Sequence, residues 1–302
     1  MAATVRALVN GAWLAERLAV AKTAGQPRSG AQLRLIDTSW YLPKTGRNGR
    51  NEYRQQHIPG AWFFDLDVAS SPDSEFDHML PSAGHFTQYA SQLGIGGDTH
   101  VVVYDGSTFG QYSAPRVWWM FRVFGHNRVS VLDGGLAAWT AQGFAVESGQ
   151  EPPVLTTPEQ PPFIAALQPD YVWDYEHVRK KLGQDDFLLM DARSEGRFKG
   201  TEPEPREGCP SGHIAGAISL PFTTMLDPQS KLLRQTDELD KVFSSRGLTR
   251  DTAPVAMCGS GVTACVLILA AHLCGRAFPP LYDGSWGEWA RRAGPKMIVT
   301  EK

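Results

Sequence analysis

The feature that most constrains this chain is an internal duplication. Four short segments occur twice in the same order, and each recurs 150 to 156 residues later. The pairs are Asp37-Thr-Ser-Trp40 with Asp191-Ala-Arg193, His57-Ile-Pro-Gly-Ala61 with His213-Ile-Ala-Gly-Ala217, Val101–Gly106 with Pro254–Gly259, and Leu132–Trp139 with Tyr282–Trp289. Self-similarity at a long fixed spacing indicates a duplicated structural unit. The 302 residues therefore divide into two copies of one domain.

A proline-rich segment separates the two copies. Residues Glu151 to Pro162 include five prolines and show no apolar periodicity. Because proline fixes φ and removes a main-chain donor, such a segment is extended and semi-rigid. We therefore predict an N-terminal domain over residues 1–148, a linker over 149–167 and a C-terminal domain over 168–302.

Short apolar runs alternate with helical patterns in each copy. Val101–Tyr104 and Val255–Met257 have the continuous apolar character of buried parallel strands. Each is followed by a loop and then by a helical pattern, over 114–124 and 264–274, that ends at a glycine. Three further runs of the same kind are Leu33–Ile36, Val129–Leu132 and Phe187–Met190. Repetition of strand, loop and helix predicts an α/β fold with a mainly parallel sheet in each domain.

Charge and hydropathy restrict the partners of the chain. A formal net charge of −3 disfavours nucleic acid and anionic membranes, which need clustered Lys and Arg. The longest apolar run, Val262–Leu273, is shorter than the ~20 residues of a membrane span and predicts a buried helix. We expect no nucleic-acid or membrane partner, and a chain that is a monomer or a weak dimer.

The first 30 residues are mildly basic. Their charged residues are Arg6, Glu16, Arg17, Lys22 and Arg28. This composition fits an amphipathic first helix with apolar positions at Leu8, Trp13, Leu14 and Leu18, and it also fits a mitochondrial presequence. We therefore expect a cytoplasmic or mitochondrial protein, or one found in both compartments.

All four cysteines lie in the C-terminal copy. The spacing of Cys258, Cys265 and Cys274 fits no zinc-ligand pattern, so no metal is expected. Cys265 and Cys274 fall in an apolar helical pattern and are predicted core residues. Cys209, between Gly208 and Pro210, is predicted to be an exposed thiol without a catalytic role.

Cys258 stands at the end of a predicted strand and just before a predicted helix. Gly259 and Gly261 allow a sharp turn whose N–H groups point inward and form an anion-binding concavity. The N-terminus of the following helix adds partial positive charge. Both effects favour a thiolate, so Cys258 is a predicted nucleophile rather than an inert buried thiol. In the N-terminal copy Asp105 stands in its place, and a carboxylate cannot take the role of a thiolate, which predicts a catalytically silent domain.

The loop Cys258-Gly-Ser-Gly-Val-Thr-Ala264 resembles the active-site loop of the tandem-domain rhodanese family of sulfurtransferases. The resemblance covers nearly the whole chain and is close to the branch that uses 3-mercaptopyruvate. The other segments that carry it are Asp37–Pro43, His57–Gly60, Asp77–Pro81, Tyr112–Trp119, Gly196–Arg206 and Tyr282–Trp286.

The resemblance implies sulfur transfer by covalent catalysis without a cofactor. The Cys258 thiolate would take the outer sulfur of a donor and become a persulfide, held by the loop residues Gly259, Gly261, Val262 and Thr263. A thiol acceptor such as thioredoxin or a small thiol, or cyanide, would then remove the sulfur. From 3-mercaptopyruvate the products would be pyruvate and, with a reductant, hydrogen sulfide.

The donor is indicated by the two residues after the nucleophile. Thiosulfate sulfurtransferases of this family carry basic residues there, whereas this chain has the uncharged Gly259 and Ser260. That favours monoanionic 3-mercaptopyruvate over dianionic thiosulfate, which remains the alternative donor. The resemblance further implies that Arg197 and Arg206 hold the carboxylate and carbonyl oxygens, and an arginine fork suits a carboxylate. The alternative for each arginine is a surface ion pair with one of the nearby glutamates Glu195, Glu202, Glu204 or Glu207.

The family also suggests a proton relay beside the cysteine. The matching residues are Ser260 of the C-terminal domain and His78 and Asp67 of the N-terminal domain, with Asp65 as an alternative acid if that stretch is extended. The alternative is that Ser260 and His78 only hold their own loops. His57 and His213 recur in both copies and are predicted to be structural. Four tryptophans, Trp118, Trp119, Trp286 and Trp289, are predicted to lie in the core or at a domain interface.

Two other functions are weaker. A rhodanese-fold phosphatase needs an arginine six positions after its cysteine, and Ala264 stands there. A non-enzymatic rhodanese module that only binds partners usually lacks the cysteine, and Cys258 is present.

Overall fold

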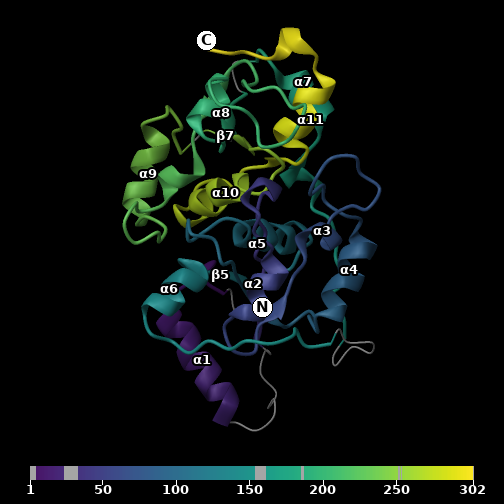
Figure 1. The fold of residues 1–302 in the computed structure, drawn as a ribbon. Helices are drawn as coiled ribbons and strands as arrows, with labels where there is room; N and C mark the ends of the chain where they lie inside the picture. The colour runs from purple at the N-terminus through teal and green to yellow at the C-terminus, as the bar shows by residue number, and fades with distance from the viewer. Residues whose placement is uncertain are drawn as a thin grey trace. The chain divides into compact units, whose positions relative to one another are not determined.

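The computed structural model describes residues 5–23, 33–153, 161–184, 187–250, 252 and 254–301. Part of the predicted linker, 154–160, and Arg28 of the basic N-terminal region lie outside these residues. The chain forms two compact units. The first comprises 1–69, 81–167 and 229–232, and the second comprises 70–80, 168–228 and 233–302. Figure 1 follows the chain through both units.

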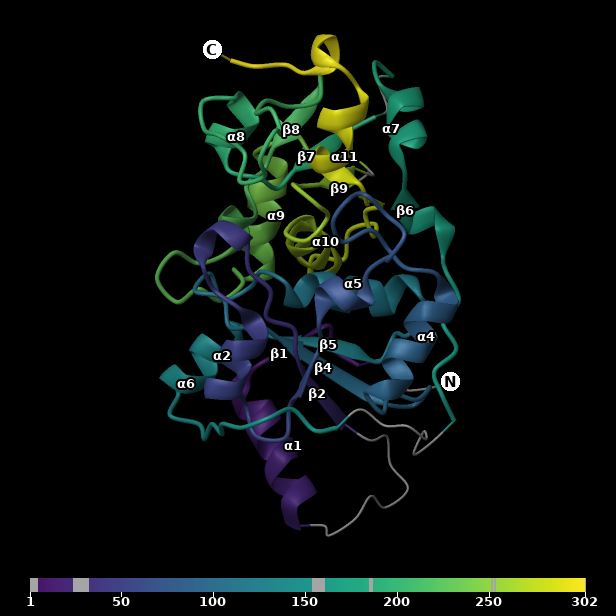
Figure 2. The ribbon, with the colours of Figure 1, turned by 45° about the vertical axis from the view of Figure 1, so that its right-hand side comes forward.

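The first unit is a five-stranded sheet with helices on both faces (Figure 2). Its strands are β1 (Leu8–Val9), β2 (Leu33–Asp37), β3 (Trp62–Phe63), β4 (His100–Tyr104) and β5 (Val129–Leu132). Its α-helices are α1 (Gly11–Thr23), α2 (Gly49–Gln55), α3 (Leu66–Ala69), α4 (Ala83–Gln92), α5 (Ala114–Val123) and α6 (Gly135–Ala141), with a 3-10 turn at Pro43–Thr45. Every strand pair is parallel and the order is β1-β5-β4-β2-β3.

The second unit repeats this plan. Its strands are β6 (Val172–Trp173), β7 (Leu189–Asp191), β8 (Ala217–Ser219), β9 (Val255–Met257) and β10 (Leu281–Tyr282). Its α-helices are α7 (Tyr175–Lys181), α8 (Glu195–Lys199), α9 (Thr236–Ser244), α10 (Ala264–Leu273) and α11 (Ser285–Arg292). Its 3-10 turns are Pro169–Tyr171, Phe222–Met225 and Pro295–Met297. The parallel order β6-β10-β9-β7-β8 matches the first sheet strand for strand, as the duplication predicts.

The central strands are buried because helices cover both faces of each sheet. Tyr53 of α2 and Trp139 of α6 pack on one face of the first sheet with Leu14 of α1. Tyr175 of α7 and Trp286 of α11 do the same in the second unit. The four tryptophans Trp118, Trp119, Trp286 and Trp289, predicted to lie in the core or at a domain interface, have no exposed surface.

Helix α10 explains the longest apolar run of the sequence. Its residues from Ala264 to Ala271 are all buried, so it is apolar on every side because every side is covered. Among the described residues no helix has the length and apolar character needed to cross a membrane. The predicted first helix is present but begins at Gly11, because Leu8 pairs with Val131 as part of β1 instead of belonging to the helix.

Two histidines at equivalent positions make the same kind of contacts in each unit, a carbonyl contact and a ring stack. His57 Nδ1 contacts the Tyr53 carbonyl at 2.7 Å and its ring stacks on Tyr53 at 4.0 Å. His213 Nδ1 contacts the Phe198 carbonyl at 2.9 Å and stacks on Phe198 at 3.9 Å. The structural role predicted for both is confirmed.

Candidate active site

The predicted nucleophile lies where the fold places ligands. Cys258 follows β9 directly and α10 begins six residues later, so the loop sits at the carboxyl end of a parallel strand. Gly261 has φ of +74°, a left-handed conformation that turns the chain into the helix. Cys265 N then donates to Val262 O at 3.2 Å and Val266 N to Thr263 O at 3.1 Å. The loop thus ends at a helix N-terminus.

The start of α11 fixes the main chain at Cys258. Cys258 N donates to Ser285 Oγ at 3.2 Å, and this hydroxyl donates to the Tyr282 carbonyl at 2.8 Å. Trp286 N and Gly287 N donate to the carbonyls of Cys258 and Gly259 at 3.0 and 2.9 Å. Ser285 was not predicted from the sequence, and its φ of +51° shows that the surrounding structure holds it in an uncommon conformation. These bonds leave the thiol as the part of Cys258 that is available for chemistry.

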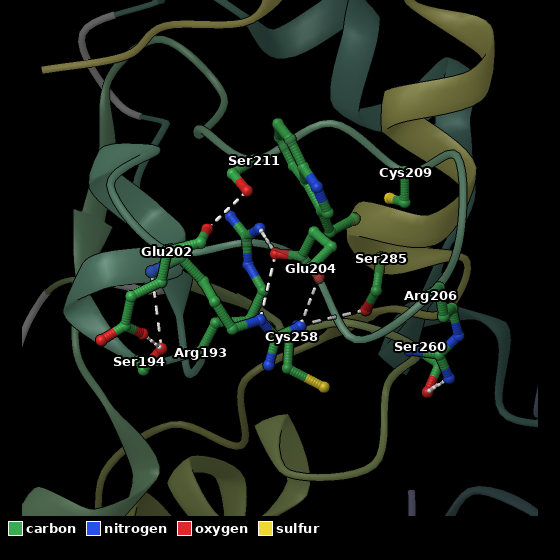
Figure 3. Close-up of polar contacts among 12 residues, drawn as sticks. Arg193, Ser194, Glu202, Glu204, Arg206, Cys209, Ser211, Cys258, Ser260 and Ser285 are labelled. Carbon is green, nitrogen blue, oxygen red and sulfur yellow. Dashed lines mark hydrogen bonds and ion pairs between the residues drawn. The ribbon is translucent and has the colours of Figure 1, made fainter. Parts of the chain in front are cut away.

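Both predicted substrate arginines lie beside the loop. A Cβ placed on Gly259 would come within 3.0 Å of Arg197 Nη2 and 3.2 Å of Arg206 Nη1. A side chain at 259 would therefore compete with the guanidinium groups for the same space. The absence of a side chain at this position allows both cations to approach the residue that follows the nucleophile. Figure 3 shows Arg206 beside Ser260, the next residue of the loop.

Each of these arginines is also held by a carboxylate. Arg197 donates through Nε and Nη2 to Glu204 at 3.0 and 2.6 Å. Arg206 donates through Nε to Asp77 at 2.5 Å and through Nη2 to Ser260 Oγ at 3.0 Å. For Arg197 the predicted ion pair, here with Glu204, and the position beside the loop occur together. Arg206 also lies beside the loop, but its partner is Asp77, because segment 70–80 packs against it, and not one of the predicted glutamates.

A buried arginine anchors this network. Arg193 is 1% exposed and bonds Asp191, the Gly212 carbonyl and Glu204 Oε1, while its guanidinium lies 4.2 Å from the ring centroid of Trp286. Burial alone would lower the pKa of Arg193, but the carboxylates of Asp191 and Glu204 raise it above its usual value. Glu204 therefore joins the buried cation Arg193 to the more exposed cation Arg197. Neither Arg193 nor Glu204 was predicted as a site residue, although the Asp-x-Arg pattern at the end of β7 is a usable signal.

Two of the three residues of the predicted relay, His78 and Ser260, are in contact. His78 Nδ1 lies 2.8 Å from Ser260 Oγ, and both residues are buried. His78 belongs to segment 70–80, which comes from the N-terminal half of the sequence but packs as part of the second unit. Asp67 lies in the first unit, where its Oδ1 accepts from Trp40 Nε1 at 3.0 Å.

The alternative acid, Asp65, is used elsewhere. The expected extended stretch is instead the short helix α3, and Asp65 Oδ1 accepts from the N–H groups of Asp67 and Val68 at its start. Its other oxygen pairs with Arg50 at 3.0 Å. Asp65 thus caps a helix and does not share a face with Asp67 as the extended model predicted.

The remaining thiols lie in different environments. Cys265 and Cys274 are buried in and after α10, as predicted. Cys209 is half-buried against the core of the second unit rather than exposed, because Trp286 and its neighbours cover it. Burial raises the pKa of the Cys209 thiol, which makes it a poor nucleophile at neutral pH. Among the described residues no cluster of His, Cys, Asp or Glu is arranged to hold a metal.

Asp105 shows what the equivalent loop does in the first unit. Its Oδ2 accepts from the N–H groups of Tyr112, Ser113 and Ala114 at 2.9 to 3.0 Å, and its Oδ1 accepts from Ser107 N at 3.0 Å. Burial raises the pKa of this carboxyl, and the four N–H donors oppose that effect. The anion-binding loop of the first unit is therefore filled by its own carboxylate.

Comparison with known proteins gives the same assignment to both copies. The rhodanese-like domain model matches residues 21–142 and 174–292. Human 3-mercaptopyruvate sulfurtransferase is 48% identical over 98% of this chain and 96% of its own length. Rat thiosulfate sulfurtransferase is 44% identical over 98% of this chain and 96% of its own length. The sulfur transferase subunit of yeast mitochondrial complex I superposes with a TM-score of 0.84 at 34% identity, covering 98% of this chain and all of that one.

Proposed function

Because this chain belongs to the rhodanese family, we propose that it is a sulfurtransferase that moves sulfur from 3-mercaptopyruvate through a persulfide on Cys258. The observation that carries the proposal is Cys258 at a strand end and before a helix N-terminus, with Arg197 and Arg206 converging on the adjacent Gly259. The 48% identity to human 3-mercaptopyruvate sulfurtransferase supports this reaction and this donor, and the 44% identity to rat thiosulfate sulfurtransferase supports sulfur transfer.

The transfer step forms one sulfur–sulfur bond and breaks one carbon–sulfur bond. The Cys258 thiolate attacks the sulfur of 3-mercaptopyruvate, and the electron pair of the broken bond leaves with the carbon as the enolate of pyruvate. The proton of the donor thiol ends on that carbon, which gives pyruvate and leaves the cysteine as a charged persulfide. The N-terminus of α10 stabilises this negative sulfur.

The two arginines suit the rest of the donor. A guanidinium offers paired N–H groups in the geometry of a carboxylate, and Arg197 and Arg206 both keep a nitrogen facing Gly259. We assign to them the carboxylate and carbonyl oxygens of the donor. The loop residues Gly259, Gly261, Val262 and Thr263 surround the persulfide.

Ser260 and His78 are proposed to pass the proton. Ser260 lies two residues after the nucleophile, and its 2.8 Å contact with His78 allows the imidazole to exchange a proton with the hydroxyl. Asp67 as the third member remains a prediction.

The second half of the cycle needs a thiol acceptor. We propose that thioredoxin or a small thiol attacks the outer sulfur of the persulfide, regenerates the Cys258 thiolate and releases hydrogen sulfide once a second thiol reduces the product. Cyanide would serve in an assay. We further propose a cytoplasmic or mitochondrial location, supported by a structural relative that is a subunit of a mitochondrial complex.

A direct comparison of donors tests the proposal. The purified protein is assayed with 3-mercaptopyruvate and with thiosulfate at equal concentrations and fixed ionic strength, with a thiol acceptor. We expect kcat/KM for 3-mercaptopyruvate to be the larger by at least about tenfold, equivalent to ~1.4 kcal/mol in transition-state binding. A larger kcat/KM for thiosulfate would replace the proposed donor by the alternative one, because the relatives include thiosulfate sulfurtransferases.

A further inference from the structure

Segment 70–80 carries a carboxylate into the neighbourhood of the nucleophile. It is fixed on either side of Asp77, since Leu80 N donates to Asp283 Oδ2 at 2.6 Å and Arg291 Nη1 donates to the Glu75 carbonyl at 3.4 Å. The adjacent His78 bonds Ser260 and has a φ of +62°, which is uncommon for a residue with a side chain. Asp77 is thus held at its place by the residues around it, although its own side chain is 56% exposed.

Asp77 accepts a hydrogen bond from Nε of Arg206, so the two terminal nitrogens of this guanidinium face the loop of the nucleophile. Nε donates to Asp77 at 2.5 Å, Nη2 donates to Ser260 at 3.0 Å, and Nη1 is the nitrogen nearest to Gly259. These residues line one small concavity together with Glu75, Phe76, Gly284, Gly287 and Arg291. The ion pair therefore both orients Arg206 and offsets its charge at the point where a donor must bind.

The charges of this network balance. Arg193 and Arg197 face Asp191 and Glu204, and Arg206 faces Asp77. Three cations thus stand against three carboxylates, and Arg291 and Glu75, which line the same concavity as Arg206, add one charge of each sign. A site with no net charge admits a monoanion more readily than a dianion, because each further negative charge on the donor meets the carboxylates as well as the arginines.

We propose that Asp77 is a specificity-determining positioning residue, which selects a monoanionic donor by offsetting the charge of Arg206. The proposal rests on the proposed sulfur-transfer function and deepens it. Asp77 bonds Arg206 and acts through it. Its removal would leave Arg206 bonded to Ser260 but uncompensated, which favours the dianion thiosulfate over the monoanion 3-mercaptopyruvate.

The test is the ratio of kcat/KM for thiosulfate to kcat/KM for 3-mercaptopyruvate in Asp77→Asn and in the unaltered protein. Because Asp77 is half exposed, we expect a rise of about fivefold at low salt that diminishes as ionic strength increases. Asp77→Glu keeps the charge and should keep the ratio of the unaltered protein. Glu75→Gln is the matched control, since it removes one charge from the same segment and pocket without breaking the Arg206 pair.

The outcomes separate this proposal from a structural role and from the function itself. If Asp77→Asn changes both kcat/KM values by the same factor, Asp77 only positions Arg206 and the proposal is wrong. An equal rise in Glu75→Gln would also overturn it, because the effect would then be a general loss of negative charge. If the unaltered protein does not use 3-mercaptopyruvate, the proposed function fails, while a rise in the thiosulfate value of Asp77→Asn would still support the charge argument.

Discussion

The two copies use the same loop position in opposite ways. In the first unit, Asp105 follows β4 and its carboxylate accepts four main-chain N–H groups of its own loop. In the second unit, Cys258 follows β9, and Gly261 turns the shorter loop directly into α10. The first loop binds a carboxylate that it carries itself, whereas the second is proposed to stabilise the anion formed on Cys258 during the reaction. The two copies thus keep the same fold but differ in the residue at this loop position, which is the basis for predicting that the first copy is catalytically silent.

The neighbouring strands β2 and β7 each end in an aspartate, and the partner of that aspartate differs between the two copies. Asp37 ends β2 and accepts from Ser39 N at 2.9 Å and Ser39 Oγ at 2.5 Å. Asp191 ends β7 and pairs with the buried guanidinium of Arg193. The second copy therefore carries a cation where the first has a hydroxyl. That cation holds Glu204, and Glu204 holds Arg197.

The largest expected effect comes from removing the nucleophile. Cys258→Ser should lower sulfur transfer by at least about 10⁴-fold while leaving thermal unfolding unchanged, because the hydroxyl has similar size but is a far weaker nucleophile. Steady-state assays and calorimetry measure the two quantities. Substantial remaining activity would mean that another thiol carries the sulfur. The difference between the Cys258 and Asp105 loops would then not explain where the reaction occurs.

Removing the carboxylate of Asp105 in the first loop should instead lower stability and leave sulfur transfer almost unchanged. Asp105→Ala leaves four buried N–H groups without their acceptor, so we expect a loss of about 3–5 kcal/mol in unfolding free energy. Below the unfolding transition, kcat/KM for sulfur transfer should stay within about twofold of the unaltered value. Denaturant titration and steady-state assays check both statements. A stable variant, or a folded one with much reduced activity, would contradict the structural role of Asp105.

The pH dependence of the unfolding free energy should show that the buried carboxyl of Asp37 has a raised pKa. Burial raises the pKa of its carboxyl from 3.8 to about 7, so the folded state holds a proton that the unfolded state releases. Stability from this group is full below pH ~4 and is lost as pH rises towards ~7. Between pH 5 and 8 the unaltered protein should lose about 2–3 kcal/mol relative to Asp37→Asn, which cannot ionise.

The comparison with Asp37→Asn cancels other titrations. Burial lowers the pKa of His100 and His126 to about 4, which makes stability rise with pH over part of the same range. These histidines are present in both proteins, so their contribution disappears from the difference. A difference that does not change with pH would show that Asp37 is ionised throughout.

The smallest expected effect on activity comes from removing the charge of Glu204, the carboxylate that holds Arg197. Glu204→Gln keeps the size of the side chain but weakens the hydrogen bonds that orient Arg197. KM for 3-mercaptopyruvate should therefore rise, and kcat/KM should fall about 10–30-fold. Glu202→Gln is a matched control from the same segment, since Glu202 bonds Ser194 and not either arginine. Equal effects of the two substitutions would mean that the carboxylate next to Arg197 has no special role.

The sequence predicts the parts of this account that depend on local pattern. The duplication, the buried strands, the apolar helix α10 and the loop of Cys258 follow from spacing and composition, and the structure shows each of them. The network around Arg193 could not be predicted in the same way, because Asp191, Glu204 and Trp286 meet only after the chain has folded. The same holds for Asp77, which reaches Arg206 from 129 residues earlier in the chain.

Local conformation explains the other differences. Residues 66–69 form a short helix instead of an extended stretch because Asp65 caps its N-terminus. Cys209 is half-buried because the loop that holds it also bonds Trp286 through the Pro210 carbonyl at 2.8 Å. In both cases a tertiary or capping contact decides the environment of a residue whose neighbours in the sequence indicate an open loop.

The central claim is that one thiol of the second copy carries the sulfur. Mass measurement of the intact protein and of its peptides, after brief treatment with 3-mercaptopyruvate and removal of excess donor, tests this directly. We predict one added sulfur atom, located on the peptide that contains Cys258, and none in Cys258→Ser. Sulfur found on Cys209 alone, or an undiminished label in Cys258→Ser, would contradict the account.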